Sequence, residues 1–317
     1  MVKKMSKQIV CAALALVLAC GLLPGCTTEV ANNGSEASGT EASISVTDMT
    51  GRQVKLSGPA TEVVTLTAAD CEIVYALGAG DTVVGRGEFC NYPDEALMIP
   101  AVESGSETNI EQIIALNPDL VLMSTMAQSK EQIEQLENAN ITVFVSDATN
   151  IAETYESILL IGTLTGKDDE AKAIVSDMKE VFADLSAKAA AAKGSEQKTI
   201  YFEVSPLEYG LWTAGSDTFM DEVANMLGLK NVFSDVSGWA EISEEQVLER
   251  NPDYILTVGM YFGDGPTPVE SILSRTGWED VTAIKNQGIL NLQQDELTRP
   301  GPRLSEGATL IYKLVYG

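Results

Sequence analysis

The sequence predicts two similar α/β lobes joined by one long helix. Three observations carry this prediction. A helix-turn-strand unit occurs twice, an uninterrupted helical segment lies between the two occurrences, and 317 residues are enough for two domains. The units are residues 109–122, NIEQIIALNPDLVL, and residues 243–256, SEEQVLERNPDYIL, at a constant offset of 134 residues (109 to 243). A solenoid would need a shorter period and more copies, so two lobes fit better.

Each copy of the repeat describes the same physical unit. A capping residue, Asn109 or Ser243, precedes a short helix whose first turn carries acids, as the helix dipole favours. An Asn-Pro-Asp sequence then stops the helix, because proline cannot continue the amide ladder. The apolar run that follows has the length of a buried strand.

The segment between Gly166 and Gly194 predicts the connecting helix. Its apolar residues recur at helical spacing, and at 1.5 Å per residue the helix would be roughly 40 Å long. Such a helix suits a rigid link between two lobes. The apolar stripe consists of Ala171, Ile174, Val175, Met178, Val181, Phe182 and Leu185.

The other elements follow from alternation, capping residues and glycine stops. A hairpin is expected over residues 44–56. Strands are expected at 62–67, 82–84, 141–145, 199–204 and 288–292. Helices are expected at 68–77, 129–137, 151–164, 217–227, 268–275 and after 303. The predicted domains are an N-terminal lobe over 44–165, a connecting helix over 166–194 and a C-terminal lobe over 195–317.

The first 43 residues are predicted to lie outside the fold. A lysine-rich start and the apolar run 9–23 indicate a signal peptide over residues 1–25, and Leu-Pro-Gly-Cys26 resembles a bacterial lipobox. Residues 26–43 then form a lipidated Cys26 and a flexible polar tether. The alternative is an ordinary secretory signal with a coincidental cysteine. We expect an exported protein, lipid-anchored to the outer face of the cell membrane.

Composition excludes several functions. A net charge of −26 argues against nucleic-acid binding, which needs a basic surface. The chain has no histidine, which argues against a zinc or manganese site and removes the usual general base, so neither a cofactor nor an enzyme is expected. In an oxidising compartment Cys71 and Cys90 either pair or remain separate thiols, and the sequence leaves both open.

The pattern resembles the substrate-binding lipoproteins of ABC importers, in the class that carries cobalamin and ferric siderophores. Four segments, which together cover nearly all of the mature chain, carry the resemblance: 63–80, Asn-Tyr-Pro at 91–93, the first repeat copy, and 239–247 with Arg-Pro-Gly-Pro-Arg-Leu at 299–304. The resemblance implies two Rossmann-like α/β lobes joined by a single long rigid helix, with a ligand cleft between the lobes. It also implies a monomer that delivers its ligand to an ABC permease dimer.

Several residues are predicted to contact the ligand, because exposed aromatic rings can stack on a flat macrocycle and arginine can pair with its anions. Tyr92, Trp239 and Arg299 match the family's cleft positions. Phe89, Trp212 and Arg86 are equally compatible with core or surface roles. The predicted ligand contacts are Tyr92, Phe89, Trp239, Trp212, Tyr261, Arg299 and Arg86. Arg303 is expected to be structural.

Glu111 and Glu245 occupy equivalent positions in the two repeat copies. In the family, an acid at each of these places docks onto arginines of the permease, whereas the alternative role is to stabilise the first helical turn. Glutamate recurs while its neighbours differ, Ile110 against Glu244, which favours docking.

The ligand class stays open at this stage. The Asn-Tyr-Pro sequence and the lack of a cationic cluster favour a corrinoid such as cobalamin. Two tryptophans of cobalamin binders are missing near Gly105 and Ser124, which keeps a ferric siderophore or haem possible, with a tyrosine such as Tyr92 or Tyr261 as iron ligand. The alternatives of another class are an exported enzyme with paired carboxylates, and an adhesion or scaffold lipoprotein.

Overall fold

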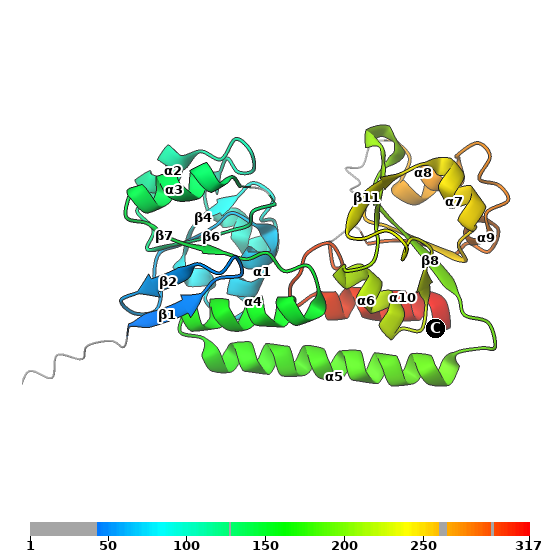
Figure 1. Ribbon diagram of the computed structural model, residues 1–317, viewed down its shortest axis with the longest axis horizontal. Coiled ribbons are helices and arrows are strands. Elements are labelled where there is room, and N and C mark those ends of the chain that lie inside the picture. Colours follow the sequence, from blue (N-terminus) through cyan, green and yellow to red (C-terminus); the bar gives the residue numbers. More distant parts are fainter. Residues whose placement is uncertain (1–42, 127, 260–264, 293–294) are drawn as a thin grey trace, which may run out of the picture. The chain divides into compact units, whose positions relative to one another are not determined.

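The structure is a computed structural model that describes residues 43–317 except 127, 260–264 and 293–294. Residues 1–42, with the predicted signal peptide and Cys26, lie outside the described part. The described chain contains two large sheets, each with its own helices, a separate two-stranded sheet, and a 25-residue helix whose sequence lies between the two large sheets (Figure 1). No helix among the described residues is long and apolar enough to span a bilayer.

The first sheet has five parallel strands in the order β5-β4-β3-β6-β7. Its strands are β3 (Val63–Thr65), β4 (Val83–Gly87), β5 (Ala101–Val102), β6 (Leu120–Met123) and β7 (Thr142–Val145). Its helices are α1 (Ala68–Ala76), α2 (Ile110–Leu116), α3 (Lys130–Asn138) and α4 (Ile151–Leu164), with short 3-10 turns at Gly80–Thr82 and Asp94–Met98. The predicted hairpin is confirmed as β1 (Ile44–Thr47) paired with β2 (Gln53–Leu56).

The second sheet has six strands and mixed direction. Strand β8 (Thr199–Ser205) pairs in parallel with β10 (Lys230–Asn231) and β12 (Tyr254–Thr257), and β12 pairs in parallel with β13 (Ile289–Asn291). An antiparallel edge that the sequence did not predict adds β9 (Leu211–Ala214) and β11 (Trp239–Ile242). The helices are α6 (Phe219–Met226), α7 (Glu244–Arg250), α8 (Pro268–Leu273), α9 (Thr282–Lys285) and α10 (Leu304–Tyr316), and Leu207–Tyr209 forms a 3-10 turn.

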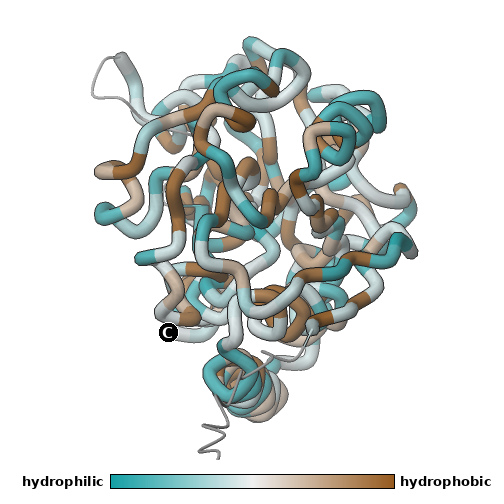
Figure 2. Tube along the Cα trace, turned by 90° about the vertical axis from the view of Figure 1, so that its left-hand side faces the viewer, coloured by the Kyte–Doolittle hydropathy of each residue, from teal (hydrophilic) through white to brown (hydrophobic). Residues whose placement is uncertain are grey.

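The long helix α5 (Asp168–Ala192) packs against α4 and α10. One stripe of its residues is buried, which confirms the predicted periodicity for five of the seven predicted residues. Ile174 is half-buried and Val181 is exposed, contrary to the prediction. That stripe belongs to a continuous hydrophobic cluster that also contains residues of β3, α1, α4, β8, α6 and α10. Figure 2 shows hydrophobic residues mostly inside the fold and hydrophilic residues mostly on its outer helices and loops. The buried stripe consists of Ala171, Val175, Met178, Phe182, Leu185 and Ala189.

The repeated unit has the same structure in both copies. The side chains of Asn109 and Ser243 accept hydrogen bonds from the backbone of Gln112 and Gln246, as predicted from their capping positions. Each helix ends where the Asn-Pro-Asp sequence begins, as predicted. The last helical residues are Leu116 and Arg250, the caps Asn117 and Asn251 have left-handed backbones, and proline then prevents continuation.

The aspartate of each Asn-Pro-Asp sequence joins the repeat to its own sheet. The Asp119 carboxylate accepts from the Thr61 amide at 2.9 Å and from its hydroxyl at 3.1 Å, just before β3. The Asp253 carboxylate accepts from the Thr199 amide and hydroxyl at 2.9 and 3.0 Å, at the start of β8. The repeated sequence therefore specifies a scaffold, and the segments around it carry the site.

Candidate functional site

Phe89 and Tyr92 of the predicted ligand residues follow the carboxyl end of a parallel strand, whereas Arg86, Trp212 and Trp239 lie within strands. Parallel α/β sheets bind ligands beyond these ends, where the connecting loops emerge. Strand β4 ends at Gly87 and leads into the loop that carries Phe89 and Tyr92. Strand β8 ends at Ser205 and leads through the 3-10 turn into β9.

The first-lobe loop presents two aromatic rings. Phe89 is 69% exposed and Tyr92 is 39% exposed. The Tyr92–Pro93 peptide bond is cis. The guanidinium of Arg303 lies over the Tyr92 ring, 3.9 Å from its centroid, which leaves the ring partly exposed. The exposed Phe89 side chain is available for a flat apolar ligand.

Arg86 supports this loop from β4. Its guanidinium donates to the carbonyl of Ile99 at 3.1 Å and to the carbonyls of Gly87 and Glu88 at 3.2 and 3.4 Å. These contacts tie two loop segments together. The guanidinium of Arg86, which was predicted to contact the ligand, is therefore already hydrogen-bonded to the protein backbone.

Arg299, predicted to pair with ligand anions, is buried instead among protein carboxylates. It is 8% exposed, and it donates to Glu72 Oε1 at 2.7 Å and to Asp295 Oδ2 at 2.5 Å. It also donates to the Phe89 carbonyl at 3.3 Å. Its charge is therefore balanced without a ligand. Arg303, expected to be structural, is likewise buried.

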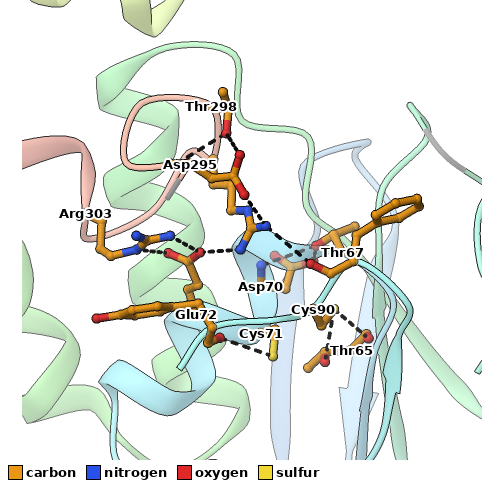
Figure 3. A network of polar contacts seen from close by, with 12 residues as sticks. Thr65, Thr67, Asp70, Cys71, Glu72, Cys90, Asp295, Thr298 and Arg303 are labelled. Atoms are coloured by element: carbon orange, nitrogen blue, oxygen red, sulfur yellow. Dashed lines mark hydrogen bonds and ion pairs between the residues drawn. The ribbon is translucent and has the colours of Figure 1, made fainter. Parts of the chain in front are cut away.

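Glu72 is the centre of this network, as Figure 3 shows. Its side chain lies on α1 and is 2% exposed. Arg303 donates to both of its oxygens, to Oε2 at 2.8 Å and to Oε1 at 2.7 Å, while Arg299 shares Oε1. The sequence analysis did not single out Glu72. The available signal was an acid inside an apolar helical run, since a buried acid must be paired.

The second lobe contributes two tryptophans on neighbouring strands. Trp239 on β11 is half-buried and meets Phe219 edge-on, with ring centroids 5.7 Å apart. Trp212 on β9 is 39% exposed and lies opposite Glu241 in the ladder. Tyr209, in the turn before β9, is 77% exposed. The side chains of Tyr209 and Trp212 are therefore exposed to solvent, whereas Trp239 is half-buried against Phe219.

The predicted docking acids both lie on the surface. Glu111 and Glu245 are exposed in the first turns of α2 and α7. The Ser243 hydroxyl and the helix amide lower the pKa of Glu245, so this carboxyl is ionised at neutral pH. Tyr261 and Cys26 fall outside the described residues.

Two buried groups lie beneath the first-lobe loop. Cys71 and Cys90 are free thiols in one small cluster with Ala96, and Cys71 Sγ contacts the Tyr92 carbonyl at 3.9 Å. Asp70, the residue before Cys71, is fully buried, and its Oδ1 has no hydrogen-bond partner. Burial raises the pKa of Asp70 to about 7, against the lowering effect of its hydrogen bond with Thr67.

Neither a cavity nor a cluster of acids among the described residues indicates a second ligand site or a metal site. A cavity of about 530 Å³ lies between α5 and α10, and none of the predicted ligand residues lines it. In the part of the chain that the structure describes, no group of three or more Cys, Asp or Glu side chains is placed to hold a metal ion.

Comparison with known proteins gives one family for this chain. The sequence model described as "Periplasmic binding protein" matches residues 63–296. The ABC transporter substrate-binding lipoprotein YvrC of Bacillus subtilis is 35% identical over 307 residues, which cover 95% of each chain. The vitamin B12-binding protein of Pectobacterium carotovorum is 27% identical over 244 residues, which cover 76% of this chain and 83% of that protein.

Solved structures show the same fold. A possible iron-binding, periplasmic solute-binding protein of Staphylococcus epidermidis has a TM-score of 0.66 at 29% identity, covering 81% of this chain and 99% of that one. The vitamin B12-binding protein BtuF of Vibrio cholerae has a TM-score of 0.67 at 24% identity, covering 81% of this chain and 96% of that one. The second likeness shows the fold alone, which is the two-lobed fold predicted from the sequence.

Proposed function

The chain belongs to the periplasmic binding protein family, and we propose that it captures a corrinoid such as cobalamin outside the cytoplasm for an ABC permease. The family consists of solute-binding proteins and not enzymes. Cobalamin, haem and ferric siderophores are the ligands to decide between. The choice among them depends on which charges the site can offer.

The observation that carries the proposal is that the arginines have protein partners. All six arginines of the chain lie among the described residues, and each one donates to protein acceptors. Those near the predicted ligand aromatics are Arg86, Arg299 and Arg303, whose partners are described above. The buried Arg275 donates to Glu203 at 2.6 and 2.8 Å.

Lysines add little positive charge at the strand ends. Lys130 lies in the first turn of α3, the helix that follows β6, and it pairs with Glu134 at 3.8 Å. Haem propionates and the carboxylates or catecholates of siderophores are anions, which proteins bind with free arginines or lysines. The rim of a corrin ring carries neutral carboxamides, which need hydrogen-bonding groups and apolar surface.

The exposed aromatic side chains fit the same ligand. Phe89 and Tyr92 in the first lobe, and Tyr209 and Trp212 in the second, offer flat surface for a macrocycle. The names of several relatives at 25–31% identity, which are vitamin B12-binding proteins, support the proposal.

Haem is the second candidate, and one observation favours it. Tyr209 is 77% exposed, so its phenol could serve as an iron ligand. Such a site would still lack a free arginine for the propionates. We therefore rank haem below a corrinoid.

A titration tests the choice. The mature chain without its lipid anchor is titrated with cyanocobalamin, haemin and a ferric siderophore at low and high salt, and tryptophan fluorescence is followed. We expect micromolar or tighter binding of cyanocobalamin that salt barely changes, because no ion pair forms. Binding of haemin or the siderophore alone, or affinity that falls steeply with salt, contradicts the corrinoid proposal.

A variant shows which tryptophans report binding. Trp278 is 1% exposed and donates to Glu244, so it should not sense the ligand. In the Trp212→Phe, Trp239→Phe double variant it is the remaining tryptophan, and we expect the quenching by cyanocobalamin to disappear. Persistent quenching would place the ligand elsewhere.

We also propose that Glu111 and Glu245 dock onto the permease and that Cys26 carries the lipid. The exposure of both acids at equivalent positions in the two repeat copies supports the first proposal. Mass spectrometry of the protein extracted from membranes tests the second, since lipidation would leave a chain that begins at a modified Cys26. An unmodified chain released into the medium would contradict it.

A further inference from the structure

Glu72 connects parts of the chain that belong to different sheets. It lies on α1, which follows β3 of the first sheet. Its two arginine partners lie in the turn between β13 of the second sheet and α10. The turn approaches α1 closely, because a Cβ at Gly301 would meet the Ala69 carbonyl and Ile73 at 3.9 Å. The contact is therefore made by packing as well as by charge.

The two arginines reach from Glu72 to the loop that carries the predicted ligand aromatics. Arg299 donates to the carbonyl of Phe89, and Arg303 lies over the ring of Tyr92. Asp295 holds Arg299 from the other side, and the Thr298 hydroxyl donates to Asp295 at 3.2 Å. Each of the two links runs from Glu72 on α1 through an arginine guanidinium to Phe89 or Tyr92. Figure 3 shows Glu72 together with Arg303 and Asp295 in this network.

We propose that Glu72 is a positioning residue of the ligand site, which fixes the Phe89–Tyr92 loop through Arg299 and Arg303. The inference rests on the proposed function, in that it takes Phe89 and Tyr92 to face the ligand. Glu72 itself does not touch the ligand, because its side chain is 2% exposed. It holds two cations that would otherwise be buried with insufficient negative charge, and these cations hold the loop.

In this arrangement both arginines are engaged by protein acceptors. A buried carboxylate that accepts three charge-assisted hydrogen bonds restrains both partners in one geometry. A loop fixed before binding loses less entropy when the ligand arrives, so affinity should depend on Glu72. A purely structural ion pair inside one lobe would affect stability without this effect.

Such a pair exists and provides the matched control. Glu203 on β8 accepts two hydrogen bonds from Arg275, at 2.6 and 2.8 Å, and both side chains are buried. Both residues belong to the second lobe. Glu203→Gln should destabilise the protein as Glu72→Gln does, but it should leave the first-lobe loop unchanged.

Hydrogen–deuterium exchange without ligand tests the network directly. We expect Glu72→Gln to speed amide exchange at least tenfold in residues 88–92 and in residues 296–303, while Glu203→Gln speeds exchange only around its own strand and α8. Unchanged exchange at 88–92 in Glu72→Gln, or an equal increase there in Glu203→Gln, would overturn the proposal.

A second variant guards against loss of folding. Glu72→Asp keeps the buried negative charge but is one methylene shorter, so it cannot hold both guanidinium groups at hydrogen-bond distance. We expect this variant to fold, to exchange faster at 88–92 and to release cyanocobalamin about tenfold faster than the parent. Parent-like exchange, or faster exchange with an unchanged dissociation rate, contradicts the positioning role. If the parent binds no corrinoid, the function proposal fails while the exchange result still judges the network.

Discussion

Asn117 and Asn251 end equivalent helices with left-handed backbones, at φ of 49° and 43°. The aspartate two residues later, Asp119 or Asp253, then binds the start of the central strand of its own sheet. The asparagines differ in their side chains. Asn251 Oδ1 accepts from the Thr282 amide at 2.8 Å, which joins α7 to α9.

This difference makes a stability prediction. Asn117→Ala and Asn251→Ala should each lower the free energy of unfolding by about 1 kcal/mol or more, because alanine is strained in the left-handed region. Asn117→Gly should be nearly neutral, since glycine adopts that conformation freely. Asn251→Gly should cost about 1 kcal/mol through the lost hydrogen bond. Urea denaturation measures all four, and equal effects of the two glycine variants would contradict the proposed difference.

Much of the scaffold could be predicted because its signals are local. Capping residues, helical periodicity and glycine stops lie within a few residues of the elements that they define. The helix predicted over 151–164 is α4 with the same bounds. Most of the stripe predicted for 166–194 is buried in α5, but Ile174 is half-buried and Val181 is exposed. The β9–β11 edge was missed: Trp239 was interpreted only as a ligand contact, and the structure places it at the start of β11, which pairs with β9.

The buried network could not be predicted in the same way. Glu72 and Arg303 are 231 residues apart, so no pattern along the chain joins them. Arg299 was interpreted from its sequence context as a ligand contact, and only the fold shows that Asp295 and Glu72 surround it. Such ion pairs bear on which ligand is bound, because an arginine that is paired with protein carboxylates is not free to pair with an anionic ligand.

The two cysteines give a prediction about thiol chemistry. Cys71 and Cys90 are both fully buried and free. In the chain that begins after Cys26, we expect no reaction with a thiol reagent in the native state and two reactive thiols per chain in denaturant. Fast native reaction would contradict the burial. An absence of thiols in denaturant would show that the pair had formed a disulfide.

The surface acids give a prediction about transport. With the cognate permease in proteoliposomes, Glu111→Gln combined with Glu245→Gln should lower transport at least tenfold, since two charges steer and position the complex. Ligand affinity should not change. Glu131→Gln with Glu249→Gln, which removes exposed acids from α3 and α7, is the control and should transport normally. Equal loss in both double variants would indicate a general charge effect.

Asp70 gives a prediction about pH. Its pKa is about 7 in the folded chain and 3.8 ordinarily, because burial disfavours the carboxylate. Between about pH 4 and about pH 7 Asp70 is protonated in the folded chain but ionised in the unfolded chain. The contribution of Asp70 to the free energy of unfolding is therefore full below about pH 4 and is lost as the pH rises to about 7. Asparagine does not titrate, so Asp70→Asn should not lose stability through this group as the pH rises.

We therefore expect the stability of Asp70→Asn relative to the parent to increase by about 2–3 kcal/mol between pH 5 and pH 8. Asp221→Asn is the control, because Asp221 is nearly as buried but accepts from the amides of Asn225 and Asn231 at 2.7 and 2.9 Å. That variant should lose stability at both pH values. Thermal unfolding across pH 5–8 measures both variants. A constant difference between Asp70→Asn and the parent would mean that Asp70 does not titrate in this range, since only a titrating group makes the difference depend on pH.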